Sequence, residues 1–246
     1  MILSGHQPVY LPGVILFNKI ALSDRFMFVG HVQFSHKSWQ QRNRVNLGGR
    51  ELFLSVPVRK ADRFGQSIDE AEIQDDGWRR KHLGSIRQAY GKHPFFADYF
   101  PGIEAEITAD HPTLGALNRA LIRRMMVWLD IATPVDDSRD HPAIQGAKTD
   151  MLIEMCQAVG ADRYLSNEGA RVYVEEARMA EAGIHHCWQI FASPQYVPGA
   201  RVPFLPDVSA IDLLFSLGPA AAAVVRAAGR VEPGPFAPAP RPGARA

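Results

Sequence analysis

Cysteine is scarce in this chain, and neither sign of charge is in excess. Only two cysteines, Cys156 and Cys187, occur among its 246 residues, and they form no CxxC pair. This scarcity argues against a zinc ribbon and against a disulfide-rich secreted scaffold, and it favours a reducing, cytoplasmic location. The 27 basic and 26 acidic residues leave a formal charge of +1, so we expect no nucleic-acid partner.

Long apolar runs are also missing. The longest candidate, residues 220–228, is Ala-rich and far shorter than the roughly 20 residues that a membrane span requires. The N-terminus has no basic region followed by a continuous apolar core. We therefore expect no membrane partner. Hydrophobic residues nevertheless make up 46% of the chain, which is enough for a substantial core.

Strand-like and helical patterns alternate along most of the chain. Apolar runs typical of buried strands follow a β-prone start at Ile2 and occupy residues 25–29, 51–58, 163–166 and 184–191. Helical patterns cover residues 13–21, 150–159, 172–182 and 207–215. Units of this length are typical of a parallel sheet with right-handed crossovers. The expected fold class is α/β, with a mostly parallel Rossmann-like sheet flanked by helices.

The same patterns predict the domain organisation. Residues 76–131 are helical throughout, so we interpret them as a helical insertion within a single α/β domain of residues 1–230. Residues 231–246 are rich in Pro, Ala, Gly and Arg and cannot form a core, which predicts a disordered tail.

The first candidate site is the turn after the first expected strand, residues 5–12. His6, Gln7 and Tyr10 lie there between two prolines and the start of a helix. Ligands of open α/β sheets bind where a strand ends at a helix N-terminus, so we assign His6 a catalytic role and Gln7 and Tyr10 substrate binding. The structural alternative is a buried, hydrogen-bonded histidine in a tight turn.

A second polar segment, residues 33–45, follows the second expected strand and is expected to form a loop. The planar fork of Arg42 is suited to a carboxylate or phosphate, and we assign it a catalytic role. Gln33, Asn43 and Arg44 can bind polar substrate groups, and Trp39 offers a stacking face for a sugar or base. The alternative is a solvated loop whose arginines pair with nearby acids.

A third segment, residues 166–173, again joins a strand to a helix. Ser166 can cap the helix and Gly169 lets backbone amides approach a ligand, so both, with Tyr173, are assigned to substrate binding. A purely structural capping turn is the alternative.

Several catalytic signatures are missing. No Gly-x-Ser-x-Gly elbow, no cysteine in a polar turn, no P-loop and no dinucleotide fingerprint occurs, so neither a covalent nucleophile nor a nucleotide cofactor is expected. Adjacent His185 and His186 would point to opposite faces of a strand and cannot easily share one ion. We predict no metal site and no cofactor.

Taken in order, these segments resemble the WbqC-like protein family of bacteria over about residues 1–220. The residues that carry the resemblance are Gly5-His6-Gln7-Pro8, Tyr10, Lys19-Ile20, Gln33-Phe34, Trp39-Gln40, Arg42-Asn43-Arg44, Val56-Pro57-Val58, Leu165-Ser166, Gly169, Tyr173 and Ile211-Asp212-Leu213-Leu214-Phe215. The family is known mainly from gene clusters for O-antigen and other surface glycans, some with N-acylated amino sugars, and from natural-product clusters. This chain departs from the family at Gly30, where an Asp is frequent, and at Asn167, where a Gly is frequent.

The resemblance and the polar turns together favour an amide-forming transferase. It would pass an acyl or aminoacyl group, from a free or carrier-protein-bound donor, to an amine such as an amino sugar. His6 would act as base, while Arg42, Asn43 and Arg44 would hold a carboxylate, phosphate or oxyanion. Two alternatives stay open: a nucleotidyltransferase or ATP-dependent ligase of similar fold, and a non-catalytic binding protein of a glycan pathway.

Overall fold

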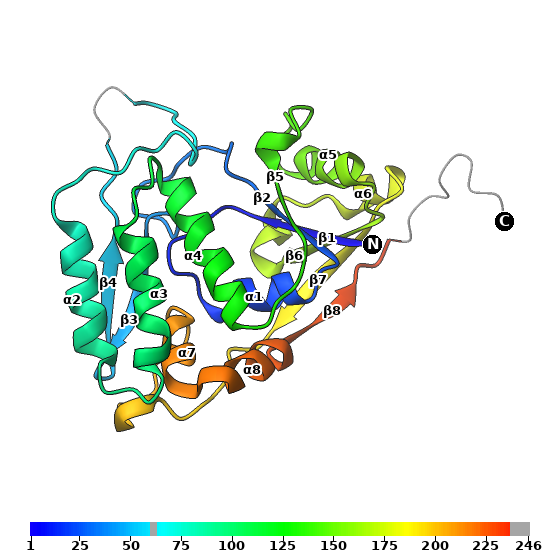
Figure 1. Cartoon of the computed structure of the whole chain (residues 1–246). Coiled ribbons are helices and arrows are strands. Elements are labelled where there is room, and N and C mark those ends of the chain that lie inside the picture. The colour runs from blue at the N-terminus through cyan, green and yellow to red at the C-terminus, as the bar shows by residue number, and fades with distance from the viewer. Residues whose placement is uncertain (60–62, 237–246) are drawn as a thin grey trace.

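The structure, a computed structural model, describes residues 1–59 and 63–236. Its centre is a six-stranded sheet with the order β5-β2-β1-β6-β7-β8 (Figure 1). The first five strands are parallel, and β8 runs antiparallel to β7 at one edge. The prediction of a mostly parallel α/β sheet is therefore confirmed. The strands are β1 (Ile2–His6), β2 (Arg25–Phe28), β5 (Val135–Asp137), β6 (Arg163–Asn167), β7 (His185–Phe191) and β8 (Gly229–Pro233).

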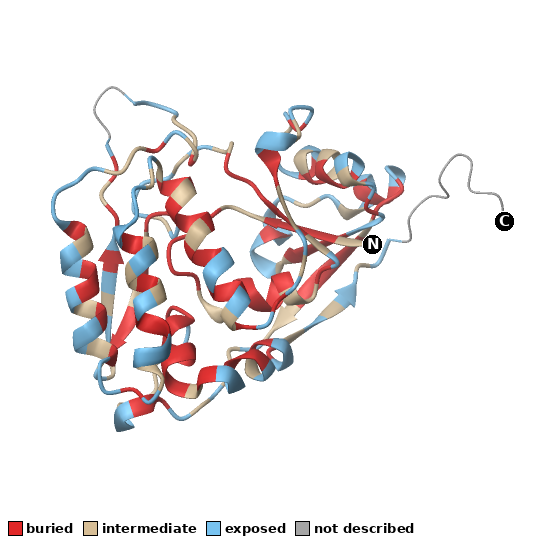
Figure 2. Ribbon diagram, viewed as in Figure 1, coloured by how far each residue is buried: buried red, intermediate tan, exposed pale blue. Residues whose placement is uncertain are grey.

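Helices cover both faces of this sheet. Phe26 and Phe28 of β2 belong to a core that includes α1 and α4, whereas Met27 belongs to a second core with α5. Because both faces are covered, β2 has a continuous apolar sequence, and Figure 2 shows buried residues along the central strands and on the surrounding helices. The helices are α1 (Val14–Ala21), α2 (Trp78–Tyr90), α3 (Phe96–Thr108), α4 (Leu114–Trp128), α5 (Thr149–Val159), α6 (Glu176–Glu181), α7 (Ile211–Leu217) and α8 (Ala221–Ala227).

A two-stranded hairpin lies beside the main sheet, among α2, α3 and α7 (Figure 1). Its strands are β3 (Arg42–Leu47) and β4 (Arg50–Ser55), joined at Gly48 and Gly49 with φ angles of 62° and 86°. Those angles suit a primed hairpin turn, which glycine adopts without strain. The hairpin core merges with the core that packs on α1, so one apolar cluster connects hairpin, helices and sheet.

Part of the segment expected to be a loop is in fact β3. Residues 33–45 were expected to lack regular structure, but Arg42, Asn43 and Arg44 pair with Ser55, Leu54 and Phe53 of β4. The prediction of a loop was wrong there because the buried positions of the strand are occupied by a polar residue, Asn43, and then by Val45. A polar residue on the core face hides the period of two that would reveal a strand.

Two other boundaries differ from expectation. The helix expected over residues 172–182 is the shorter α6, preceded by a 3-10 helix, η2 (Glu168–Val172). The expected tail at 231–246 overlaps β8, because Val231, Glu232 and Pro233 pair with β7. Backbone pairing with an edge strand does not require an apolar pattern, so composition alone missed it. Residues 237–246 lie outside the described residues.

A buried ionic cluster ties α4 to the sheet. Arg119 of α4 pairs with Asp69 and, at 2.6 Å, with Asp137 at the end of β5; Asp137 also binds Arg139 at 2.9 Å. Burial alone would raise the pKa of Asp137, but the hydrogen bonds from Arg139 and the charge of Arg119 hold it below its usual value. Each charge in the cluster thus has a partner.

The stability of the fold should decrease in mild acid because of His82. This buried imidazole lies 2.9 Å from the Tyr10 hydroxyl, and burial lowers its pKa from 6.5 to about 4. Between pH 6.5 and about 4, His82 is protonated in the unfolded chain but stays neutral in the folded chain. The contribution of neutral His82 to the free energy of unfolding is therefore complete above pH 6.5 and is lost as the pH falls to about 4. We expect His82→Gln to reduce that loss by on the order of 1–3 kcal/mol in urea titrations at pH 7.5 and 4.5. An unchanged difference between the two pH values would contradict the assignment.

Candidate functional site

The strand order creates a crevice at the carboxyl end of β1. This strand has β2 on one side and β6 on the other, and the chain reaches β6 only after adding β2 and β5 on the first side. In open α/β sheets, ligands bind at such a reversal of strand order. His6 is the last residue of β1 and Asn167 the last residue of β6, so both stand at this point.

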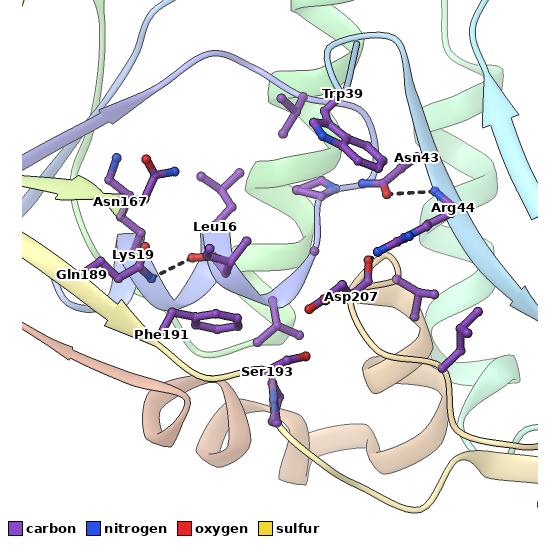
Figure 3. Close-up of a pocket in the computed structure, with 18 of the residues that line it drawn as sticks. Leu16, Lys19, Trp39, Asn43, Arg44, Asn167, Gln189, Phe191, Ser193 and Asp207 are labelled. Atoms are coloured by element: carbon purple, nitrogen blue, oxygen red, sulfur yellow. Dashed lines mark hydrogen bonds between the residues drawn. The ribbon is translucent and has the colours of Figure 1, made fainter. Parts of the chain in front are cut away.

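Two cavities meet at this crevice. The larger has a volume of about 430 Å³, and the smaller about 260 Å³. His6, Lys19 and Asn167 contribute to the walls of both, so the cavities adjoin at these residues. Figure 3 shows the larger cavity, with Lys19, Asn167 and Gln189 at one end and Trp39, Asn43 and Arg44 at the other.

His6 is a neutral imidazole that uses one of its ring nitrogens, Nδ1, in a hydrogen bond. Nδ1 lies 2.7 Å from the carbonyl oxygen of Gln7, and because a carbonyl only accepts, Nδ1 carries the proton. Burial first, and the charge of Lys19 second, lower the pKa of His6 to about 4, although the Gln7 carbonyl acts in the opposite sense. At neutral pH, Nε2 therefore presents a lone pair at the junction of the cavities.

Lys19 is a buried cation that the sequence reasoning did not single out as a site residue. Its ammonium donates to the carbonyl oxygen of Gly5 at 2.9 Å, and burial lowers its pKa to about 8. Within residues 1–59 and 63–236, no carboxylate forms an ion pair with it. The sequence feature that could have identified Lys19 is its position between the apolar residues Phe17 and Ile20 of α1. An unpaired buried ammonium favours a negatively charged ligand.

Arg44 and Trp39 form the far end of the larger cavity. The Arg44 guanidinium lies over the Trp39 ring at 5.8 Å, donates to the carbonyl oxygen of Asp207 at 3.0 Å and pairs with Glu51. Trp39 is 51% exposed and stacks on Phe53, so part of its aromatic surface is accessible to a ligand. Charge and stacking surface thus occur together at this end.

Other expected site residues lie elsewhere or are engaged. Asn43 lines the larger cavity, but its amide donates to the carbonyl oxygens of Tyr10 and Leu11 and so holds the turn. Tyr10 is completely buried. Arg42, with its guanidinium 5.0 Å from the Phe53 ring, and Gln33 line neither cavity. In this set, only Asn43 contributes to a cavity wall.

The smaller cavity collects the first and third polar turns. Gln7, Ser166, Gly169 and Tyr173 all contribute to its wall, together with His6. Gln7 is positioned by a 2.7 Å hydrogen bond that its side-chain oxygen accepts from Gln40. The two turns are far apart in the sequence, and the parallel pairing of β1 with β6 brings them together.

A model of the WbqC-like protein family matches residues 7–224. This chain belongs to the WbqC-like protein family. A relative from Mycobacterium tuberculosis (strain ATCC 25618 / H37Rv), "Uncharacterized protein Rv1507c", is 31% identical over 215 residues, which cover 86% of this chain and 92% of the relative. No solved structure shows a significant match.

Gly30 marks the place where WbqC-like proteins were expected to carry an Asp. A Cβ added at Gly30 would overlap the carboxylate of Asp69 and the guanidinium of Arg119. The carboxylate of Asp69 therefore occupies the space that a side chain at position 30 would fill. In this WbqC-like protein, a carboxylate from a different part of the chain lies beside the end of β2.

Two further observations concern metal ligands and membrane-spanning helices among the described residues. In the ranges 1–59 and 63–236, no group of three or more His, Cys, Asp or Glu side chains is arranged to hold a metal ion. Among the same residues, no helix has the length and apolar character needed to cross a membrane.

Proposed function

We propose that this WbqC-like protein is an amide-forming transferase that passes an acyl or aminoacyl group to an amine, such as an amino sugar, in surface-glycan or natural-product biosynthesis. The observation that carries the proposal is a neutral imidazole, His6, at the wall shared by two adjoining cavities. A transferase of this kind must hold two substrates and remove a proton from the attacking amine.

The two cavities differ in a way that suits these two substrates. The larger one would hold the amine acceptor, with Trp39 stacking on a sugar or base and Arg44 binding a phosphate or carboxylate. The smaller one would hold the acyl group, and Lys19 would stabilise the oxyanion that forms on its carbonyl oxygen. The sequence analysis assigned anion binding to both Arg42 and Arg44. The proposal keeps this role for Arg44 alone.

The direct test is mass spectrometry of a UDP- or dTDP-linked amino sugar incubated with the protein and an acyl thioester, or with ATP and a carboxylic acid. The proposal expects an amide product whose mass exceeds that of the amino sugar by the acyl group less one hydrogen. Binding of the amino sugar without product in any donor series would instead support a non-catalytic binding protein.

A nucleotidyltransferase or ATP-dependent ligase is the second candidate. It is favoured by the position of the His6 turn next to the Ser166–Gly169 turn at the reversal of strand order, where nucleotides also bind. In that case His6 and Lys19 would stabilise phosphate charge. Release of pyrophosphate that depends on ATP or CTP would identify this reaction.

Arg44→Ala should weaken acceptor binding. Loss of a charge-assisted hydrogen bond costs roughly 1.5–3 kcal/mol, which corresponds to an increase of about 10- to 100-fold in the KM for the amino sugar, with a smaller change in kcat. Arg50→Ala is the matched control, because Arg50 begins β4 of the same hairpin and is exposed. Equal KM values for the two variants would remove Arg44 from the binding site.

A further inference from the structure

Ser166 forms a hydrogen bond with a buried histidine on the neighbouring strand. Its hydroxyl oxygen lies 2.9 Å from Nε2 of His186, and both residues are 2% exposed. Ser166 is the fourth residue of β6 and is followed by η2, so it sits at a strand-to-helix turn and contributes to the wall of the smaller cavity. The parallel pairing of β6 with β7 places the two side chains on the same face of the sheet.

The other ring nitrogen of His186 faces a carboxylate. Nδ1 lies 3.5 Å from Oε2 of Glu176, the first residue of α6, and both atoms are buried without a hydrogen-bond partner. Gly234 covers this carboxylate: a Cβ added there would overlap Oε2, and its amide donates to the His186 carbonyl oxygen at 2.9 Å. Catalytic hydrogen bonds are frequently long before substrate binds, and this gap is of that kind.

Burial, aided by nearby charges, keeps the His186 imidazole neutral and able to accept a proton. Burial first, and then the positive charges of Lys19, Arg171 and His185, lower the pKa of His186 to about 4. The ring is therefore neutral at pH 7. Because Nδ1 faces a carboxylate, it carries the ring proton, and Nε2 is left to accept the proton of the Ser166 hydroxyl.

We propose that Ser166 is a nucleophile that is acylated during the reaction, with His186 as its base and Glu176 as the residue that orients the imidazole. Nucleophile, base and orienting carboxylate in hydrogen-bond sequence are the arrangement that activates serine in hydrolases of unrelated folds. No Gly-x-Ser-x-Gly elbow marks this serine, because the three residues come together through tertiary geometry and not through local sequence.

The step balances without any further reactant. The Ser166 oxygen attacks the carbonyl carbon of a thioester or other activated ester, and its proton passes to Nε2 of His186. The bond to the leaving group then breaks, the leaving thiolate or alkoxide takes the proton from His186, and an acyl ester of Ser166 remains. Attack by an amine forms the amide, breaks the ester bond and returns a proton to the Ser166 oxygen.

Lys19 and Asn167 line the same cavity and can donate to the oxyanion of this step. The identity of the final acceptor rests on the proposed function, but acylation of Ser166 does not. The test is therefore made without an amine.

The test uses p-nitrophenyl acetate and diisopropyl fluorophosphate as small probes, with intact-mass and peptide mass spectrometry. Wild-type protein should release one equivalent of p-nitrophenolate in a burst and carry one adduct on Ser166. Ser166→Ala should lose the adduct, whereas Ser85→Ala, on α2 outside both cavities, should keep it. Ser166→Cys retains a nucleophile and should still be acetylated, which covers the case in which the alanine variant fails to fold.

Glu176 is tested through charge and length separately. Glu176→Gln keeps the length and removes the charge, so we expect it to slow acylation by at least about tenfold. Glu176→Asp keeps the charge and should acylate faster than Glu176→Gln, whereas a role in packing alone predicts the reverse order. Folded wild-type protein that forms no adduct with either probe, or forms it on another residue, overturns the proposal. A Ser166 adduct without amide product in any donor series overturns only the proposed transferase.

Discussion

His6→Ala should reduce kcat/KM for amide formation by about 10²- to 10⁴-fold, the range that a positioned general base contributes. The reason is the protonation state of the ring. Nδ1 is committed to the Gln7 carbonyl oxygen, so Nε2 is the nitrogen available to take the proton of the amine. A pKa near 4 keeps the ring neutral at the pH of the assay.

A second substitution separates basicity from hydrogen bonding. His6→Gln keeps a side-chain amide that can donate to the Gln7 carbonyl oxygen but has no basic nitrogen, so it should be as defective as His6→Ala. His111→Ala is the matched control: its ring bonds to the carbonyl oxygen of Glu106, and it lines neither cavity. If His6→Gln retained a third or more of wild-type kcat/KM, His6 would not be the base.

Arg119→Ala should lower the free energy of unfolding by about 3–5 kcal/mol, because removal of one member leaves other buried charges without compensation. Arg119 is 2% exposed and binds two carboxylates, Asp69 and Asp137. The loss is measured from urea titrations at neutral pH.

The control for this substitution is Arg124→Ala on the same helix. The Arg124 side chain is 45% exposed and pairs with Glu106 at 2.8 Å, so its loss should cost about 0–1 kcal/mol. Similar costs for the two variants would show that the buried cluster adds little to stability beyond a surface pair.

Local patterns predicted the secondary structure well where apolar residues mark the period. The α/β class and the strand at residues 25–28 follow from chain-local sterics and burial. Prediction was wrong where a polar side chain occupies a core position, as Asn43 does in β3, and where backbone pairing alone makes a strand, as in β8.

The candidate site was predictable only in part. The His6 turn and the Ser166–Gly169 turn were singled out because each follows a strand, and both line the smaller cavity. Arg42 was singled out with them and lies outside both cavities. Arg42 and Arg44 lie two residues apart in β3 and therefore on the same face of the hairpin, so strand alternation does not distinguish them, and only the tertiary structure shows that Arg44 alone of the two lines the larger cavity.

The sequence by itself determined the α/β class, several of the strands and helices, the family and the turns that carry polar side chains. Only the tertiary structure decided which of those side chains share a cavity, that Lys19 is buried there, and that Ser166, His186 and Glu176 are in contact. The physical reason is the separation along the sequence of the residues that make each contact. Helix and strand patterns arise from neighbours a few residues apart, whereas the pairing of β1 with β6 joins residues about 160 positions apart, and no local pattern encodes that contact.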